Sequence, residues 1–288
     1  MYGVRSNRTV AWALFAYGER KRIVTAEKSA PELVRSLYLL WGHHPQPGRS
    51  GITVTQIVQA GIDLADTDGL GATSMRKVAE RLGVSTMALY NHVPRKDDLT
   101  ALMVDTAYAN LYDSVDTAKD AGDWRAGLRY VAERNWMLCT RHPWLLDIHE
   151  SRMLLGPNAT RKYEAELRVL DGIGLSDLDM EASLTTVLGV VESAARAQRS
   201  DRDQQRDSGL ADPEWWAVIA PALEHLMSDD DYPVSGRVGN TLGATFDAAR
   251  NPRHALDLGV TFVLDGIENL IHASTGSTQQ RTPSSLRT

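Results

Sequence analysis

Apolar residues recur every three to four positions along most of the chain between residues 52 and 273, and this periodicity restricts the fold more than any other feature. Such spacing places apolar side chains on one face of an α-helix. No segment shows the alternating pattern of a half-buried strand, and the sequence contains no repeats or heptads. The sequence therefore predicts an all-α protein.

Charge and turn residues divide the chain into four expected parts. Residues 1–50 hold eight Lys/Arg and three Glu, a balance of +5, which leaves −11 for the rest of a chain with net charge −6. A basic end on an acidic body is compatible with docking to DNA through one end. The parts are a poorly ordered basic extension and linker (1–50), a helix-turn-helix domain (51–115), a larger helical domain (116–273) and a disordered Ser/Thr/Gln-rich tail (274–288).

Residues 51–115 are expected to form four helices. Asp66–Gly69 ends the first, Thr73 or Ser74 can cap the second, and Pro94 ends the third. Asp97 and Asp98 suit the positive N-terminus of the fourth. The expected helices are Ile52–Ala65, a short one containing Val78, Ala79 and Leu82, Thr86–His92, and Lys96–Val115.

The segment from Thr73 to Pro94 carries the functional signal. Two short helices meet across a tight turn at Gly83, which permits a positive φ, and Ala79 lets the helices cross closely. Val78, Leu82, Val84 and Leu89 are expected to form the internal core of this pair. The second helix would then present Ser85, Thr86, Met87, Tyr90, Asn91 and His92 outward, as side chains that can reach base edges or phosphates.

Residues 52–112 resemble the DNA-binding domain of the TetR family, and the run Leu89-Tyr90-Asn91-His92-Val93 resembles its tetracycline-repressor branch. The resemblance implies a three-helix DNA-binding domain, a double-stranded DNA operator, a homodimer and a small-molecule effector, with no cofactor. It implies DNA contacts by Thr53, Arg76, Ser85, Thr86, Met87, Tyr90, Asn91, His92 and Lys96. Ser85-Thr86-Met87 and Asn91 depart from the tetracycline repressor, so its operator sequence cannot be transferred.

Further helices are expected in the larger domain, with a polar break at Arg199–Gly209. The family layout implies that Leu178–Arg199 and Pro252–Ala273 form the dimer interface, where Gly189, Ala194, Ala195 and Gly259 would allow close crossing. The other expected helices are Trp124–Thr140, Pro143–Glu150, Asn158–Ile173 and Pro213–Met227. Trp41, in the extension, is expected to pack on the core rather than to lie near DNA.

Aromatic and polar-tipped residues of this domain are candidates for an effector pocket, although each also fits a place in the core. They are Trp136, Met137, His142, Trp144, His149, Glu192, Trp215 and Trp216. Pro143 separates His142 from His149, which argues against a shared metal ion, so no metal is expected.

Two other classes of function compete with DNA-binding regulation. The sequence has no nucleophile elbow, phosphate loop, zinc-protease motif or Cys-x-x-Cys, which argues against an enzyme. A helical protein-interaction module that has lost DNA binding is the alternative, and the polar outer face of Thr86–His92 argues against it. The single cysteine, Cys139, fits a reducing cytoplasm and a structural thiol, and no apolar run is long enough to cross a membrane.

Overall fold

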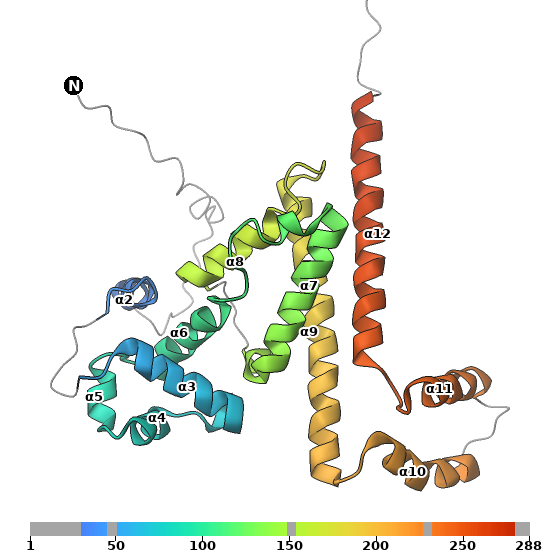
Figure 1. The fold of residues 1–288 in the computed structure, drawn as a ribbon, viewed down its shortest axis with the longest axis horizontal. Coiled ribbons are helices and arrows are strands. Elements are labelled where there is room, and N and C mark those ends of the chain that lie inside the picture. The colour runs from blue at the N-terminus through green and yellow to red at the C-terminus, as the bar shows by residue number, and fades with distance from the viewer. Residues whose placement is uncertain (1–29, 45–50, 149–153, 227–231, 280–288) are drawn as a thin grey trace, which may run out of the picture.

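The computed structural model describes residues 30–44, 51–148, 154–226 and 232–279. All regular secondary structure in these ranges is helical, which confirms the predicted all-α class. None of the described helices is long and apolar enough to cross a membrane. Figure 1 shows a smaller N-terminal group of helices, here called the head (α2–α6), beside a larger group, the body (α7–α12).

The head is built around α3, which packs against α4 and α6. Thr53 caps α3 by accepting a hydrogen bond from the Gln56 amide, and the Gln56 side chain accepts one from the Thr53 amide. This reciprocal capping box satisfies two amides that the helix itself leaves free. The head helices are α2 (Ala30–Leu40), α3 (Val54–Asp68), α4 (Met75–Leu82), α5 (Thr86–Tyr90) and α6 (Lys96–Tyr108), with the 3-10 turn η1 (Leu70–Ala72).

The body has its core where α7, α9 and α12 pack together. Leu128, Val131, Leu184, Val187 and Leu264 are fully buried there. The body helices are α7 (Trp124–Arg141), α8 (Pro157–Leu167), α9 (Asp177–Ser208), α10 (Asp212–Leu226), α11 (Pro233–Phe246) and α12 (Pro252–Gln279), with the 3-10 turns η2 (Lys119–Ala121) and η3 (Pro143–Asp147).

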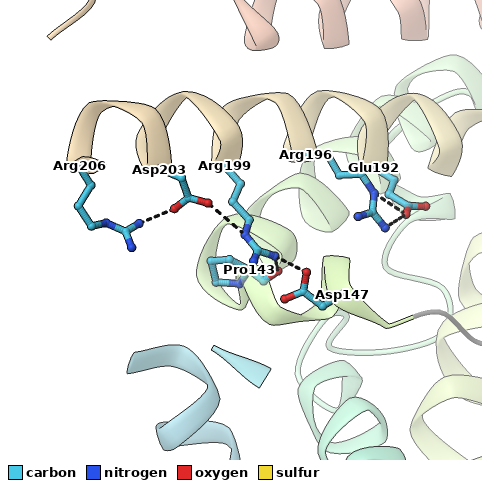
Figure 2. Close-up of polar contacts among 7 residues, drawn as sticks. All are labelled: Pro143, Asp147, Glu192, Arg196, Arg199, Asp203 and Arg206. Atoms are coloured by element: carbon cyan, nitrogen blue, oxygen red, sulfur yellow. Dashed lines mark hydrogen bonds and ion pairs between the residues drawn. The ribbon is translucent and has the colours of Figure 1, made fainter. Parts of the chain in front are cut away.

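The expected polar break at Arg199–Gly209 is wrong, because α9 continues through it to Ser208. Figure 2 shows how the charged side chains support this extension. Asp203 pairs with Arg199 at 3.7 Å and with Arg206 at 2.5 Å, which are spacings of four and three residues along the helix. Arg199 also donates to Asp147 of η3 at 2.8 Å and to the Pro143 carbonyl at 3.1 Å. The polar run therefore forms a helix held by ion pairs.

Two expected helices are shorter in the structure. The helix predicted to reach Val115 ends at Tyr108, and Arg134 donates to the carbonyls of Asn110 and Leu111 beyond that end. Leu111 then enters the body core. The helix predicted to reach Ile173 ends at Leu167.

Two other expectations underestimated the helical content. Residues 30–40 of the predicted extension form α2, whose Leu39 is buried in the head core, and α12 runs six residues into the predicted disordered tail. The sequence also gave no signal for α11, which contains Gly236, Gly239 and Gly243. The expectation that Trp41 packs on the core is wrong, because its side chain is 52% exposed, although its indole Nε1 donates to the Leu155 carbonyl at 2.9 Å.

Candidate DNA-binding face and effector region

The turn between α4 and α5 sets the geometry of the helix-turn-helix. Gly83 adopts φ +66°, a left-handed conformation that side-chain-bearing residues rarely adopt. Its N–H and the Val84 N–H bond back to carbonyls of α4, and Ser85 then caps α5 by accepting from the Ala88 amide. Val78 of α4 and Leu89 of α5 are fully buried in the head core. The glycine turn therefore fixes the direction of α5.

The outer face of α5 carries most of the candidate DNA contacts. Met87 is 70% exposed and Tyr90 is 43% exposed, although both have large apolar surfaces. Ser85 and Asn91 are exposed beside them, and Thr86 is half-buried. A helix that presents apolar and hydrogen-bonding groups together offers partners for both thymine methyl groups and polar base edges.

His92 does not have the expected outward orientation. Its side chain is only 4% exposed, and its buried Nδ1 has no hydrogen-bond partner among the described residues. The reason is geometric: α5 ends at Tyr90, so the chain turns inward before His92 and buries Val93 with it. His92 therefore packs inside the head after the end of α5, and not on the outer face of that helix.

Three other candidates flank α5. Arg76 of α4 is 80% exposed and pairs with Glu80 across one helical turn at 3.1 Å. Lys96 is exposed at the first position of α6. Thr53 is half-buried, and its hydroxyl is engaged in the α3 capping box. Two exposed cations beside α5 can bind phosphates, while contacts made by Thr53 must coexist with its capping role.

The eight effector candidates do not converge on one site. Trp136 is buried in the body core, Met137 is 51% exposed on α7, and Glu192 forms an ion pair with Arg196 on α9. Trp215 and Trp216 stack edge to face on α10, with Trp215 42% exposed. His149 lies outside the described residues.

His142 and Trp144 bind the head instead. The carboxylate of Asp66, near the end of α3, accepts from the Trp144 indole at 2.7 Å and lies 2.8 Å from His142 Nδ1. Trp144 is 1% exposed and packs within the head core. Sequence reasoning missed Asp66, because its partners lie more than 70 residues away and no local pattern marks it.

Among the described residues, the body surface holds a cavity and a groove that none of the eight candidates lines. A cavity of about 350 Å³ between α7 and α12 is bordered by Tyr130 and by the ion pair of Glu133 with Arg253. A groove of about 520 Å³ runs between α9 and the start of α12, lined mainly by small residues such as Gly189 and Ala194. Gly259 of α12 approaches Val190 of α9 closely within one chain, because a Cβ added to Gly259 would lie 2.8 Å from the Val190 side chain.

Cys139 lies in the body, packed against its core. The pKa of its thiol is raised to about 11, mainly by burial; the charges of Lys162 and Arg196 oppose this rise and that of Glu192 adds to it. A thiol with so little thiolate at neutral pH is a poor nucleophile. Among the described residues, no group of three or more His, Cys, Asp or Glu side chains is placed to hold a metal ion.

Comparisons with known proteins agree with this architecture. Residues 57–103 match the model of bacterial regulatory proteins of the tetR family, and residues 117–271 match the tetracyclin repressor-like C-terminal domain. Among solved structures, apo ActR from Streptomyces coelicolor has a TM-score of 0.58 at 21% identity, with 79% of this chain and 98% of that chain covered. The regulator SCO7222 from the same organism has a TM-score of 0.55 at 24% identity, with coverage of 76% and 99%. At this identity the structures show a shared fold.

Curated relatives extend the match over most of the chain. The HTH-type transcriptional repressor DrrR1 of Streptomyces coeruleorubidus is 35% identical over 251 residues, which cover 86% of this chain and 90% of the relative. An HTH-type transcriptional regulator of Saccharopolyspora erythraea is 32% identical over 185 residues, with coverage of 63% and 72%. The helix-turn-helix head, the helical body and these matches show that the chain belongs to the TetR family of DNA-binding transcriptional regulators.

Proposed function

We propose that the protein is a repressor that binds its operator as a homodimer and leaves it when a small molecule binds to the body. The observation that carries this proposal is the outer face of α5, where Met87, Tyr90 and Asn91 are exposed on a helix held by the Gly83 turn. The name of DrrR1, a repressor, supports repression over activation. The protein would act in the cytoplasm, where the bacterial chromosome lies.

The exposed surfaces of α9 and α12 support the dimer. Leu258, Phe262 and Leu270 of α12 are 43%, 64% and 49% exposed, which is unusual for large apolar side chains of a buried-core helix. The small-residue groove beside them would admit a helix of the second subunit closely. Two heads held by this interface could enter successive major grooves, about 34–36 Å apart.

The effector that we propose is a small, largely apolar molecule bound by the body. ActR of Streptomyces coelicolor has been solved in complex with actinorhodin and with (S)-DNPA. The pocket would use some of the eight residues proposed from the sequence. A ligand that bound His142 or Trp144 would compete with Asp66 and so loosen the contact of the body with the head. Linkage requires DNA and effector to weaken each other equally, typically by about 5–150-fold.

The proposal is tested by substituting the face of α5. Tyr90→Ala should weaken binding to operator DNA by about 5–150-fold, as the loss of a contact worth about 1–3 kcal/mol requires. The matched control is Tyr232→Ala, which removes a similarly exposed tyrosine from the body. Equal affinity of the two variants would contradict a recognition role for α5 and favour the alternative, a protein-interaction module that has lost DNA binding.

The effector step needs its own titration. Binding of the wild-type protein to the same DNA would be measured with and without a panel of apolar aromatic compounds. A compound that weakens DNA binding, and whose own binding is weakened equally by DNA, is the expected result. No change in DNA affinity with any compound that binds the body would contradict effector release.

A further inference from the structure

Helix α8 lies against the chain segment that leaves the head, and the contacts follow the same order in both. Asp105 contacts Asn158 and Ala159, the Tyr108 ring faces Lys162, and Tyr112 contacts Glu166. The steps are three or four residues on each side, so the two segments run parallel with matching faces. Figure 1 shows α8 beside α6, at the junction of head and body.

The first contact is a helix cap supplied by another helix. The N-cap residue of α8 is Gly156, which has no side chain to cap with. Asp105 of α6 takes this role: Oδ1 accepts from the amides of Asn158 at 3.1 Å and Ala159 at 2.9 Å, and Oδ2 accepts from the Asn158 side chain at 2.9 Å. Asp105 is only 4% exposed, so water cannot replace it at this helix end.

Gly156 itself fits only because it lacks a side chain. A Cβ on this residue would lie 2.0 Å from the Asp105 carboxylate, far inside van der Waals contact. The cap and the glycine are therefore complementary, and the chain before α8 is held tightly against α6. Trp41, which follows α2, bonds to the neighbouring Leu155 carbonyl, so a second head element holds the same point.

The last contact is a buried polar cluster. Glu166 is 1% exposed, and its Oε1 accepts from the Tyr112 hydroxyl at 2.8 Å and from Asn135 at 2.8 Å, while Oε2 accepts from Lys162 at 2.8 Å. Burial, and then the charge of Glu166, raise the pKa of the Tyr112 hydroxyl, which keeps it a donor. Asn135 belongs to α7, so this cluster is also where α8 meets the rest of the body.

We propose that α8 moves as one unit with α6, and that Asp105 is the positioning residue that joins them. The moving boundary of the regulator then lies between α8 and α7, inside the C-terminal domain and across the Asn135–Glu166 contact, rather than after residue 115. This inference rests on the proposed effector response, because that response is the movement that α8 would pass to the head. A ligand that shifts α7 or α9 against α8 would thereby turn the recognition helix.

The joint can be tested by distance measurements on the full chain. Spin labels would be placed at Glu80 of the head and Glu164 of α8, or at Glu80 and Gln204 of α9, all exposed, in a Cys139→Ser background. Dilution with unlabelled protein keeps the distances within one chain. The head–α8 distance should stay unchanged when the DNA beside the gene is added, while the head–α9 distance shifts. A head–α8 distance that shifts as much as the head–α9 distance would overturn the proposal.

Substitution of Asp105 tests the residue that makes the joint. Asp105→Ala should broaden the head–α8 distances in the free protein, and should raise hydrogen exchange of the Asn158 and Ala159 amides about fivefold, as loss of one helix cap does. Asp105→Asn, which keeps one acceptor oxygen, should show a smaller change, and Asp113→Ala, which removes an exposed carboxylate nearby, should show none.

The two proposals fail in distinguishable ways. If the protein bound no DNA, the proposed function would fail, but the free-protein distances would still decide whether Asp105 joins α8 to α6. Unchanged distances in Asp105→Ala would overturn the joint even if DNA binding and effector release were intact.

Discussion

The buried cluster around Glu166 makes a strong prediction about stability. Glu166→Ala removes the acid partner of Lys162, whose side chain is only 12% exposed, and it removes the acceptor for Tyr112 and Asn135. Breaking a buried ion pair by deleting one partner costs about 3–5 kcal/mol, because the remaining charge is left uncompensated. At about 2–4 °C per kcal/mol, the melting temperature should fall by about 6–20 °C.

A paired substitution separates this cause from simple loss of packing. Lys162→Met combined with Glu166→Gln removes both charges and keeps an acceptor for Tyr112 and Asn135. The free energy of unfolding of this double variant should lie within about 1 kcal/mol of the wild-type value, because neutral replacements of buried ion pairs cost little. Glu164→Ala, on the exposed side of the same helix, is the matched control and should change stability little.

Urea unfolding followed by circular dichroism measures these differences from the transition midpoints. A loss below about 1 kcal/mol for Glu166→Ala would refute the reasoning, since the carboxylate would then contribute no more than a surface group. A double variant as unstable as Glu166→Ala would show that the packing of the side chains, and not the ion pair, determines stability at this site.

Three further predictions concern other parts of the chain. Gly83→Ala should lower the free energy of unfolding by about 1–2 kcal/mol and weaken DNA binding, because φ is +66° at this position. The control Gly71→Ala, at a position with open space around it, should change neither stability nor DNA binding. Equal losses in the two variants would contradict the role of the Gly83 turn. Native Cys139 should react with iodoacetamide about 100-fold more slowly than after unfolding, since its pKa rises from 9.0 to about 11; equal rates would contradict a buried thiol. Burial raises the pKa of Asp105 above 3.8, so the free energy of unfolding of the wild type, relative to that of Asp105→Asn, should fall as pH rises from 3.8 through the raised pKa. Urea unfolding at a series of pH values measures this difference. A difference that grows in favour of the wild type with rising pH would contradict the prediction.

The head could be predicted from the sequence because its signals are local. Gly83, the capping serines and the apolar spacing around Val78 and Leu89 act over a few residues, so each marks its element directly. His92 was misplaced because α5 ends at Tyr90, two residues earlier than expected, and this changes which side chains turn inward.

The connections between head and body could not be predicted, because they join distant residues. Asp105 caps a helix more than 50 positions away, and Asp66 binds Trp144 across 78 positions. From the sequence alone, a carboxylate on a helix face is expected to be a solvated surface group. The polar stretch at the end of α9 was misjudged because it lacks apolar spacing. Ion pairs of Asp203 within the helix, and of Arg199 with Asp147 of η3, hold it helical.

The measurement that tests the central claim most directly is a fluorescence anisotropy titration of the intergenic DNA beside the gene across a salt series. The account predicts tight binding of one protein dimer per site that survives an excess of unrelated DNA. Weak binding that falls steeply with salt and that any DNA competes away would mean contacts to phosphate alone. That result would contradict sequence-specific recognition by α5 at this DNA.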